Sequence, residues 1–176
     1  KCHYPTKSPE TARGAKRSPL HDRLAAAGAY FKDVSGWEGA DWYAPAGHDA
    51  KVERLSWGRQ NWFGWWQAEH EAVRNGVGLI DMSFMSKFLV QGRDAGRVLN
   101  WLSAGQVDAA SGTITYTQWL NQEGKLEADL TVTKLTDERF LVVATDTMHR
   151  HVETWLRRGL GEARSEEHTS ELQSLA

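Results

Sequence analysis

The stretch that most constrains the fold of this 176-residue chain is the segment 116–135. Two runs rich in Thr, Val, Tyr, Trp and Leu flank a turn-forming tetrad at 121–124, which ends in Gly124, where a positive φ is expected. This pattern predicts a β-hairpin. Because a hairpin pairs antiparallel strands and helical patterns occur on both sides of it, the chain is predicted to be α+β, with packed helices on an antiparallel or mixed sheet.

The outgoing strand of this hairpin alternates in polarity, so its two faces are predicted to differ. Leu126, Ala128, Leu130 and Val132 share one face, and Glu127, Asp129, Thr131 and Thr133 share the other. A symmetric two-residue turn would place Tyr116 directly across from Asp129, whereas a three-residue turn with a bulge would shift the register by one. A carboxylate beside an aromatic ring can accept a proton or anchor a ligand; a strand Asp can also simply face water.

Helices and strands are predicted around the hairpin from periodicity and capping residues. Along the helix at 64–75, the stripe of Trp66, His70 and Val73 is expected to face inward. Helices are also predicted from residue 18 and at 93–102 and 147–158, strands at 29–34, 79–82, 87–90 and 140–143, and a loop at 36–48.

Tryptophan is unusually frequent, with nine residues in the chain, five of them between positions 42 and 66. Large aromatic side chains at this density typically fill a core or coat an interface, and less often form a ligand box.

Several classes of protein are disfavoured by the sequence. A net charge of −2 gives no electrostatic reason to expect nucleic acid or a membrane surface as partner. The single cysteine, Cys2, excludes a disulfide scaffold and a multi-cysteine metal site, and no metal site is predicted. No apolar run has membrane-spanning length, no stretch resembles a signal peptide, and no glycine-rich phosphate-binding motif occurs.

Composition divides the chain into three predicted parts. Residues 1–17 are polar and are expected to be a linker from an upstream domain, since the first residue is Lys rather than Met. Residues 18–163 form the predicted domain. Residues 164–174, R-S-E-E-H-T-S-E-L-Q-S, resemble the translation of a sequencing adapter, so 164–176 is interpreted as an artefact; the alternative is a disordered acidic tail.

Six ordered motifs together resemble one family. They are S-P-L-H-D-R-L-A-A-A-G-A from Ser18, G-W-E-x-A-D-W-Y-A-P from Gly36, G-R-Q-N-W-F from Gly58, A-E-H-x-A-V-R from Ala68, G-L-I-D-M-S-F-M-S-K-F-L-V-Q-G-R-D-A from Gly78, and the hairpin with Y-T-x-x-L-N and E-A-D-L-T-V-T. In this order they resemble the start of the folate-binding half of dimethylglycine and sarcosine dehydrogenases, which is similar to the aminomethyltransferase (T-protein) of glycine cleavage.

The resemblance implies an incomplete T-protein-like folate-binding fold within a larger enzyme. An upstream flavin domain of the same chain, holding FAD, would oxidise an N-methyl amine to an iminium. Tetrahydrofolate would then capture the one-carbon unit as 5,10-methylene-tetrahydrofolate. The implied partners are the small-molecule substrate, folate and the flavin domain. The implied compartment is the bacterial cytoplasm, or the mitochondrial matrix in a eukaryote.

The resemblance also assigns roles to individual residues. Asp129 matches the carboxylate that lies beside folate N10 and would act as general base. Tyr116 matches the aromatic residue of the pterin pocket, Met85 matches a methionine that approaches folate, and Thr131 is assigned to the same folate site. The alternatives are a non-catalytic folate-binding or assembly module, in which Asp129 only anchors folate, and a structural domain whose Trp-rich segment docks the flavin domain.

Overall fold

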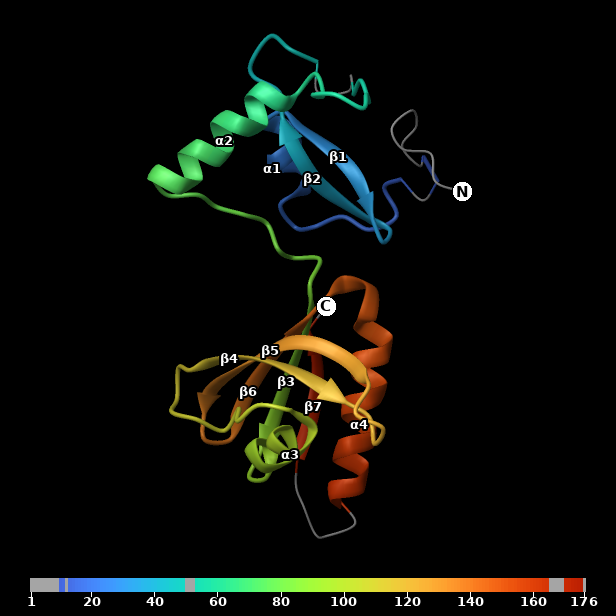
Figure 1. The fold of residues 1–176 in the computed structure, drawn as a ribbon, viewed down its shortest axis with the longest axis vertical. Helices are drawn as coiled ribbons and strands as arrows, with labels where there is room; N and C mark the ends of the chain where they lie inside the picture. Colours follow the sequence, from blue (N-terminus) through green and yellow to red (C-terminus); the bar gives the residue numbers. More distant parts are fainter. Residues whose placement is uncertain (1–9, 12, 50–52, 165–169, 176) are drawn as a thin grey trace. The chain divides into compact units, whose positions relative to one another are not determined.

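The computed structural model describes residues 10, 11, 13–49, 53–164 and 170–175. The chain divides into two compact units, Lys1–Phe84 and Met85–Ala176, which are described separately (Figure 1). Both contain helices and antiparallel strand pairs, so the predicted α+β class is confirmed.

The first unit is built around a strand pair that the sequence only half predicted. β1 (Ala29–Val34) lies where a strand was expected, but its partner β2 (Trp37–Tyr43) replaces the predicted loop. The connection at Ser35 and Gly36 has φ values of 53° and 85°. Two successive positive φ values are typical of a tight hairpin turn, so this short Ser-Gly step was the overlooked signal.

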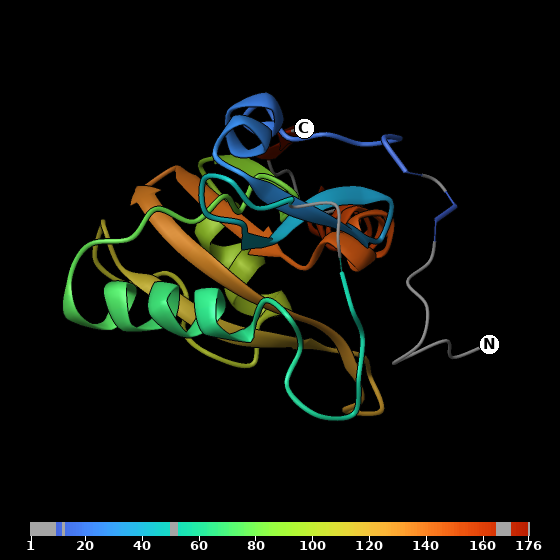
Figure 2. The same ribbon diagram turned by 90° about the horizontal axis from the view of Figure 1, so that it is seen from above.

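Two helices accompany this strand pair: α1 (His21–Ala26) and α2 (Phe63–Asn75), the latter a single unbroken helix (Figure 2). The expected inward stripe on α2 is wrong, because Trp66 is 45% exposed and Val73 is 47% exposed. Instead, the ring of Trp65 lies 5.6 Å from that of the fully buried Trp42. The aromatic contacts with β2 therefore select a different face of the helix.

The tryptophan-rich stretch mainly builds the core of the first unit. The Trp42 ring stacks on Tyr30 at 5.0 Å and on Trp62 at 6.2 Å, measured between ring centroids. Trp57 and Trp66 are exceptions, with 84% and 45% of their surface exposed. Core filling, the more common role of dense aromatics, therefore accounts for most of the cluster.

The second unit contains a five-stranded antiparallel sheet in the order β4-β5-β6-β3-β7. Its elements are β3 (Ser86–Gly92), α3 (Ala95–Leu102), β4 (Ile114–Leu120), β5 (Leu126–Thr136), β6 (Arg139–Ala144), a 3-10 turn (Asp146–Met148), α4 (His149–Arg164) and β7 (Ser170–Leu175). The predicted elements at 87–90, 93–102, 140–143 and 147–158 are confirmed, whereas 79–82 is not a strand.

One face of this sheet carries the core of the second unit. Figure 1 shows α3 and α4 beside the strands, and buried residues of both helices join those of the sheet in one cluster. Ala128, Leu130 and Val132 of β5 belong to this cluster, as the alternation predicted. The opposite face of β5 is therefore free to carry polar groups.

The hairpin register differs from both expected versions. Tyr116 pairs with Thr131, and Gln118 pairs with Asp129, so the register is two residues away from the symmetric version. Trp119 pairs with Ala128 but Leu120 pairs with Leu126, which leaves Glu127 as the extra residue of a β-bulge. A bulge reverses the alternation beyond it, so Leu126 is 62% exposed rather than buried.

The C-terminal segment pairs with the sheet. β7 lies antiparallel to β3. Backbone pairing depends little on side-chain identity, and a free sheet edge accepts an added strand readily. The adapter origin of residues 164–176 and the linker role of residues 1–17 stay predictions; residues 1–9, 12, 165–169 and 176 lie outside the described residues.

Candidate functional site

The candidate site is built on the open face of the β4–β5 hairpin. The Tyr116 hydroxyl donates a hydrogen bond to Asp129 Oδ2 at 2.8 Å. The Gln118 amide Nε2 donates to Asp129 Oδ1 at 3.1 Å. Each carboxylate oxygen of Asp129 thus accepts one hydrogen bond from the neighbouring strand.

The sheet geometry explains how β4 reaches Asp129 twice. Gln118 lies directly opposite Asp129. Tyr116 lies two residues before Gln118 on β4, so both side chains are on the same face. A diagonal neighbour across an antiparallel pair is within reach of a long aromatic side chain. The expected contact between Tyr116 and Asp129 is therefore present, although these residues are not directly paired.

The Asp129 carboxylate affects the ionisation of the Tyr116 phenol. The hydrogen bond to Asp129, with smaller contributions from burial and from the Asp129 charge, raises the pKa of Tyr116 above its usual value. Tyr116 therefore keeps its proton at neutral pH and donates it in this hydrogen bond. Tyr116 is nevertheless 66% exposed, so one ring surface is open to a flat ligand.

The structure places the other two predicted residues at different distances from Asp129. Thr131 lies on the same face of β5, half-buried and directly opposite Tyr116. Met85 is half-buried at a bend immediately before β3. β6 lies between β5 and β3, so the strand that follows Met85 is two strands away from the strand that carries Asp129. Thr131 is thus part of the cluster, and Met85 is a neighbour of it.

Gln118 is the site residue that sequence reasoning missed. The signal was available, because strict alternation along β4 puts Gln118 on the same face as Tyr116. Its importance depends on the register, which the sequence left open.

The arrangement favours chemistry that needs an accessible, fixed anion. Asp129 is exposed, and both of its partners are donors, so the carboxylate can accept a proton or attract a developing positive charge. In the part of the chain that the structure describes, no cluster of three or more His, Cys, Asp or Glu side chains could hold a metal ion.

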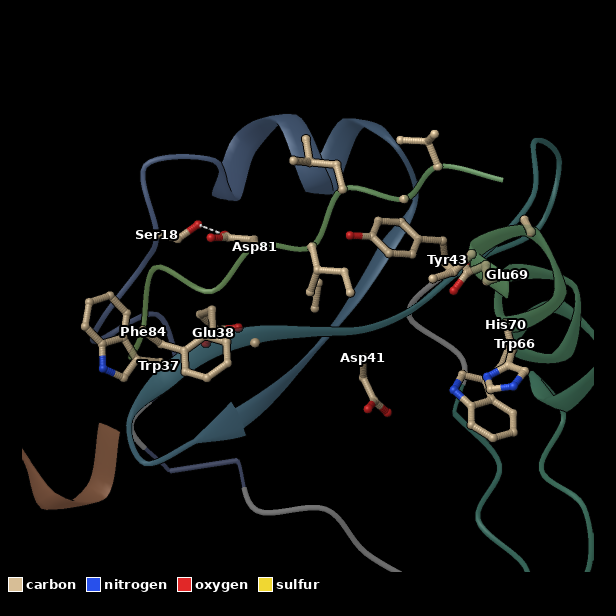
Figure 3. Close-up of a pocket in the computed structure, with 18 residues that line it drawn as sticks. Ser18, Trp37, Glu38, Asp41, Tyr43, Trp66, Glu69, His70, Asp81 and Phe84 are labelled. Atoms are coloured by element: carbon tan, nitrogen blue, oxygen red, sulfur yellow. Dashed lines mark hydrogen bonds between the residues drawn. The ribbon is translucent and has the colours of Figure 1, made fainter. Parts of the chain in front are cut away.

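A separate cavity of about 640 Å³ lies in the first unit, lined by β2, α2 and the segment 77–81 (Figure 3). The Ser18 hydroxyl donates to Asp81 Oδ2 at 2.5 Å along this wall. Burial raises the pKa of both Tyr43 and Glu69, with the nearby carboxylates adding to the shift at Tyr43. All four residues predicted to bind folate or act in catalysis belong to the second unit, whereas the residues that line this cavity belong to the first.

Comparison with known proteins identifies relatives of several kinds. The chain is 39% identical over 156 residues to 4-methylaminobutanoate oxidase (formaldehyde-forming) from Paenarthrobacter nicotinovorans, covering 89% of the chain and 19% of that protein. It is 30% identical to the mitochondrial pyruvate dehydrogenase phosphatase regulatory subunit of Mus musculus, covering 86% and 18%. It is 29% identical to human mitochondrial sarcosine dehydrogenase, covering 75% and 17%. The chain thus spans about a fifth of the length of these relatives.

Among solved structures, the chain resembles the glycine cleavage system aminomethyltransferase T from Bartonella henselae. The TM-score is 0.70 at 24% identity, covering 91% of this chain and 38% of that one. This likeness shows that the fold is the T-protein aminomethyltransferase fold. None of the helices among the described residues is long and apolar enough to cross a membrane.

A family model described as the GCVT N-terminal domain matches residues 20–176, which is most of the chain. The chain is therefore a member of this aminomethyltransferase-like, folate-binding family, which has relatives among the sarcosine and dimethylglycine dehydrogenases.

Proposed function

We propose that this chain is the first part of the folate-binding portion of a flavin-dependent N-methyl amine dehydrogenase acting on dimethylglycine or sarcosine. It passes the one-carbon unit of an iminium to tetrahydrofolate, giving 5,10-methylene-tetrahydrofolate. The observation that carries this proposal is the exposed Asp129 carboxylate, held by Tyr116 and Gln118. The relatives named for oxidation of methylamino compounds support it.

In this proposal Asp129 is the general base. Tetrahydrofolate supplies a nucleophilic nitrogen, N10, which must lose a proton as it bonds to the electrophilic carbon. Asp129 takes that proton, and its negative charge stabilises positive charge developing at the nitrogen. The second folate nitrogen, N5, then bonds to the same carbon and displaces the demethylated amine, which leaves with the N5 proton. The exposed ring of Tyr116 offers a surface for the flat pterin, with Thr131 and Met85 completing the pocket edge.

The proposal places the oxidation step elsewhere. An upstream domain of the same chain would hold FAD, which would supply the oxidation of the N-methyl group, and the resulting iminium would reach the hairpin. The partners are accordingly the amine, folate and the flavin domain. The compartment is a bacterial cytoplasm or a mitochondrial matrix; several of the relatives are mitochondrial.

The test uses the full-length parent protein with Asp129→Asn. Turnover of dimethylglycine and sarcosine is measured with and without tetrahydrofolate, and formaldehyde and methylene-tetrahydrofolate are quantified. Because a positioned general base contributes about 10²- to 10⁴-fold, capture by folate is expected to fall by that factor while methyl oxidation is unchanged. Asp22→Asn, whose side chain is 98% exposed in the first unit, is the matched control. A variant that captures as well as wild type would show that Asp129 is not the base.

A non-catalytic folate-binding or assembly module is the second candidate, favoured by the similarity to a regulatory subunit. In that case Asp129 would only anchor folate. The discriminating measurement is equilibrium binding of tetrahydrofolate to the same variants. Weaker binding at Asp129→Asn, in a wild-type protein that shows no folate-dependent capture, would support the module.

A further inference from the structure

Gln118 contacts the Asp129 carboxylate, and the proposed mechanism gives this side chain no role of its own. Its Nε2 donates to Asp129 Oδ1 at 3.1 Å, while the Tyr116 hydroxyl occupies Oδ2. The two contacts come from alternate positions on one rigid strand, so they hold the carboxylate from the same side. Gln118 is half-buried, which limits competition from water for its amide.

A carboxylate on a strand needs such support because its last torsion is soft. The χ2 angle of Asp is broad and roughly two-fold, so an unsupported carboxylate samples many orientations. A single hydrogen bond from Tyr116 leaves the group free to pivot about that contact. A second donor on the other oxygen fixes the plane, and each oxygen keeps a lone pair for an incoming proton.

We propose that Gln118 is a positioning residue, which fixes the plane of the Asp129 carboxylate so that its remaining lone pairs face the reacting nitrogen. This inference rests on the proposed function, in which Asp129 is the base. Gln118 itself neither accepts a proton nor contacts the reacting atoms in this scheme.

The β-bulge at Glu127 makes Gln118, and no other residue of β4, the opposite partner of Asp129. Without the extra residue and the five-residue connection at 121–125, the symmetric register would place Tyr116 opposite Asp129. The bulge is tethered on both sides: Glu127 Oε1 accepts from Asn121 Nδ2 at 3.0 Å, and Glu127 Oε2 lies 2.9 Å from His151 Nε2. These two contacts of Glu127 therefore stabilise the register that places Gln118 opposite Asp129.

Tyr116 provides an internal reporter of this positioning. Its pKa is raised chiefly by the hydrogen bond to Asp129, whereas its contact with Gln118 acts in the opposite direction. The direction in which the Tyr116 pKa changes therefore distinguishes two outcomes of removing the Gln118 amide. If the carboxylate turns away from Tyr116, the phenol pKa falls toward its usual value. If the carboxylate stays in place, the phenol pKa rises.

The experiment compares Gln118→Met with wild type in the full-length protein. Met has the same unbranched length but lacks the donor. The matched control is Gln67→Met, because Gln67 Nε2 also donates to a carboxylate, Glu71 Oε1, at 3.0 Å, but in the first unit. The Tyr116 titration is followed by ultraviolet absorbance as the difference from the corresponding Tyr116→Phe protein.

Positioning predicts three results for Gln118→Met. The kcat for folate capture falls about tenfold, the size expected for one hydrogen bond to a charged group, with KM for tetrahydrofolate little changed. The Tyr116 midpoint falls toward its usual value. Gln118→Lys, which restores a donor, recovers most of the rate, and Gln67→Met matches wild type.

Two results would overturn the proposal. One is a capture rate equal to wild type in Gln118→Met. The other is a Tyr116 midpoint that rises or stays unchanged, since either shows that Asp129 keeps its orientation without Gln118. The titration needs no folate chemistry, so it reports on positioning even if Asp129→Asn disproves the role of Asp129 as base.

Discussion

The two faces of β5 differ in their surroundings: one packs in the core, and the other is accessible to solvent. Leu130 is 3% exposed and belongs to the core, while its neighbour Asp129 is exposed and its carboxylate accepts hydrogen bonds from two side chains of β4. The core face is committed to packing against α3 and α4. The other face keeps its polar groups accessible while the packed face holds their backbone still, which is what a precise site on a strand requires.

The largest effect should come from truncating the core face. Leu130→Ala removes a fully packed side chain, so the free energy of unfolding is expected to fall by about 2–5 kcal/mol. Thr131→Ala, one residue further and half-buried on the other face, is expected to change it by less than about 0.5 kcal/mol. Chemical denaturation of the two variants measures both values. Equal losses would mean that the two faces are not distinct.

A smaller effect on the free energy of unfolding is expected at the β-bulge, where the alternation of buried and exposed residues along β5 is interrupted. Glu127 contacts both Asn121 and His151, so Glu127→Ala should lower the free energy of unfolding by about 0.5–1.5 kcal/mol. Glu123→Ala, at the exposed turn of the same hairpin, is the matched control and should leave stability near the wild-type value. If both variants behave alike in denaturation, the tether does not stabilise the register.

The smallest effect concerns a cation on the core face. Lys134 is 8% exposed, and its Nζ lies 2.7 Å from Asp108 Oδ1 and 3.0 Å from Asp137 Oδ1. The hydrogen bonds to these carboxylates, chiefly that of Asp108, raise the pKa of Lys134. A raised pKa means that the ammonium stabilises the fold fully below about pH 10.4, the unfolded value, and ceases to do so as pH rises through the folded value.

Thermal melts between pH 8 and 12 test this third expectation. The wild-type protein should lose stability more steeply in the alkaline range than Lys134→Met, which has no ammonium at this position to deprotonate. Parallel pH profiles for the two proteins would show that Lys134 contributes no proton-linked stability.

The sequence predicted the second unit better than the first for a physical reason. Strands and helices there alternate or repeat apolar residues cleanly, as in 87–90 and 93–102, because one large core selects that pattern. In the first unit, β2 contains Gly39 and Asp41 and reads as a loop, and its role as a strand depends on tertiary contacts of Trp42. The inward face of α2 was predicted wrongly because several neighbouring aromatic residues could each pack in the core, and periodicity alone does not show that Trp65 contacts Trp42.

The side-chain contact between Tyr116 and Asp129 could be predicted, whereas the register of the hairpin could not. Alternation placed both side chains on one face, and a register error of two residues preserves that face. Which residue lies opposite Asp129, however, depends on the bulge at Glu127, and a bulge is fixed by contacts with α4 that are distant in sequence. Gln118 was missed for that reason alone.

The pairing of β7 with the outer edge of β3 has a practical consequence for producing this protein. That edge offers a row of backbone donors and acceptors which an extended segment can satisfy whatever its side chains are. A shortened version that ends at residue 163 would leave the row open, and two such molecules could join through it. Size-exclusion chromatography of that version should therefore reveal concentration-dependent self-association, and a lysine placed at Leu89 should suppress it.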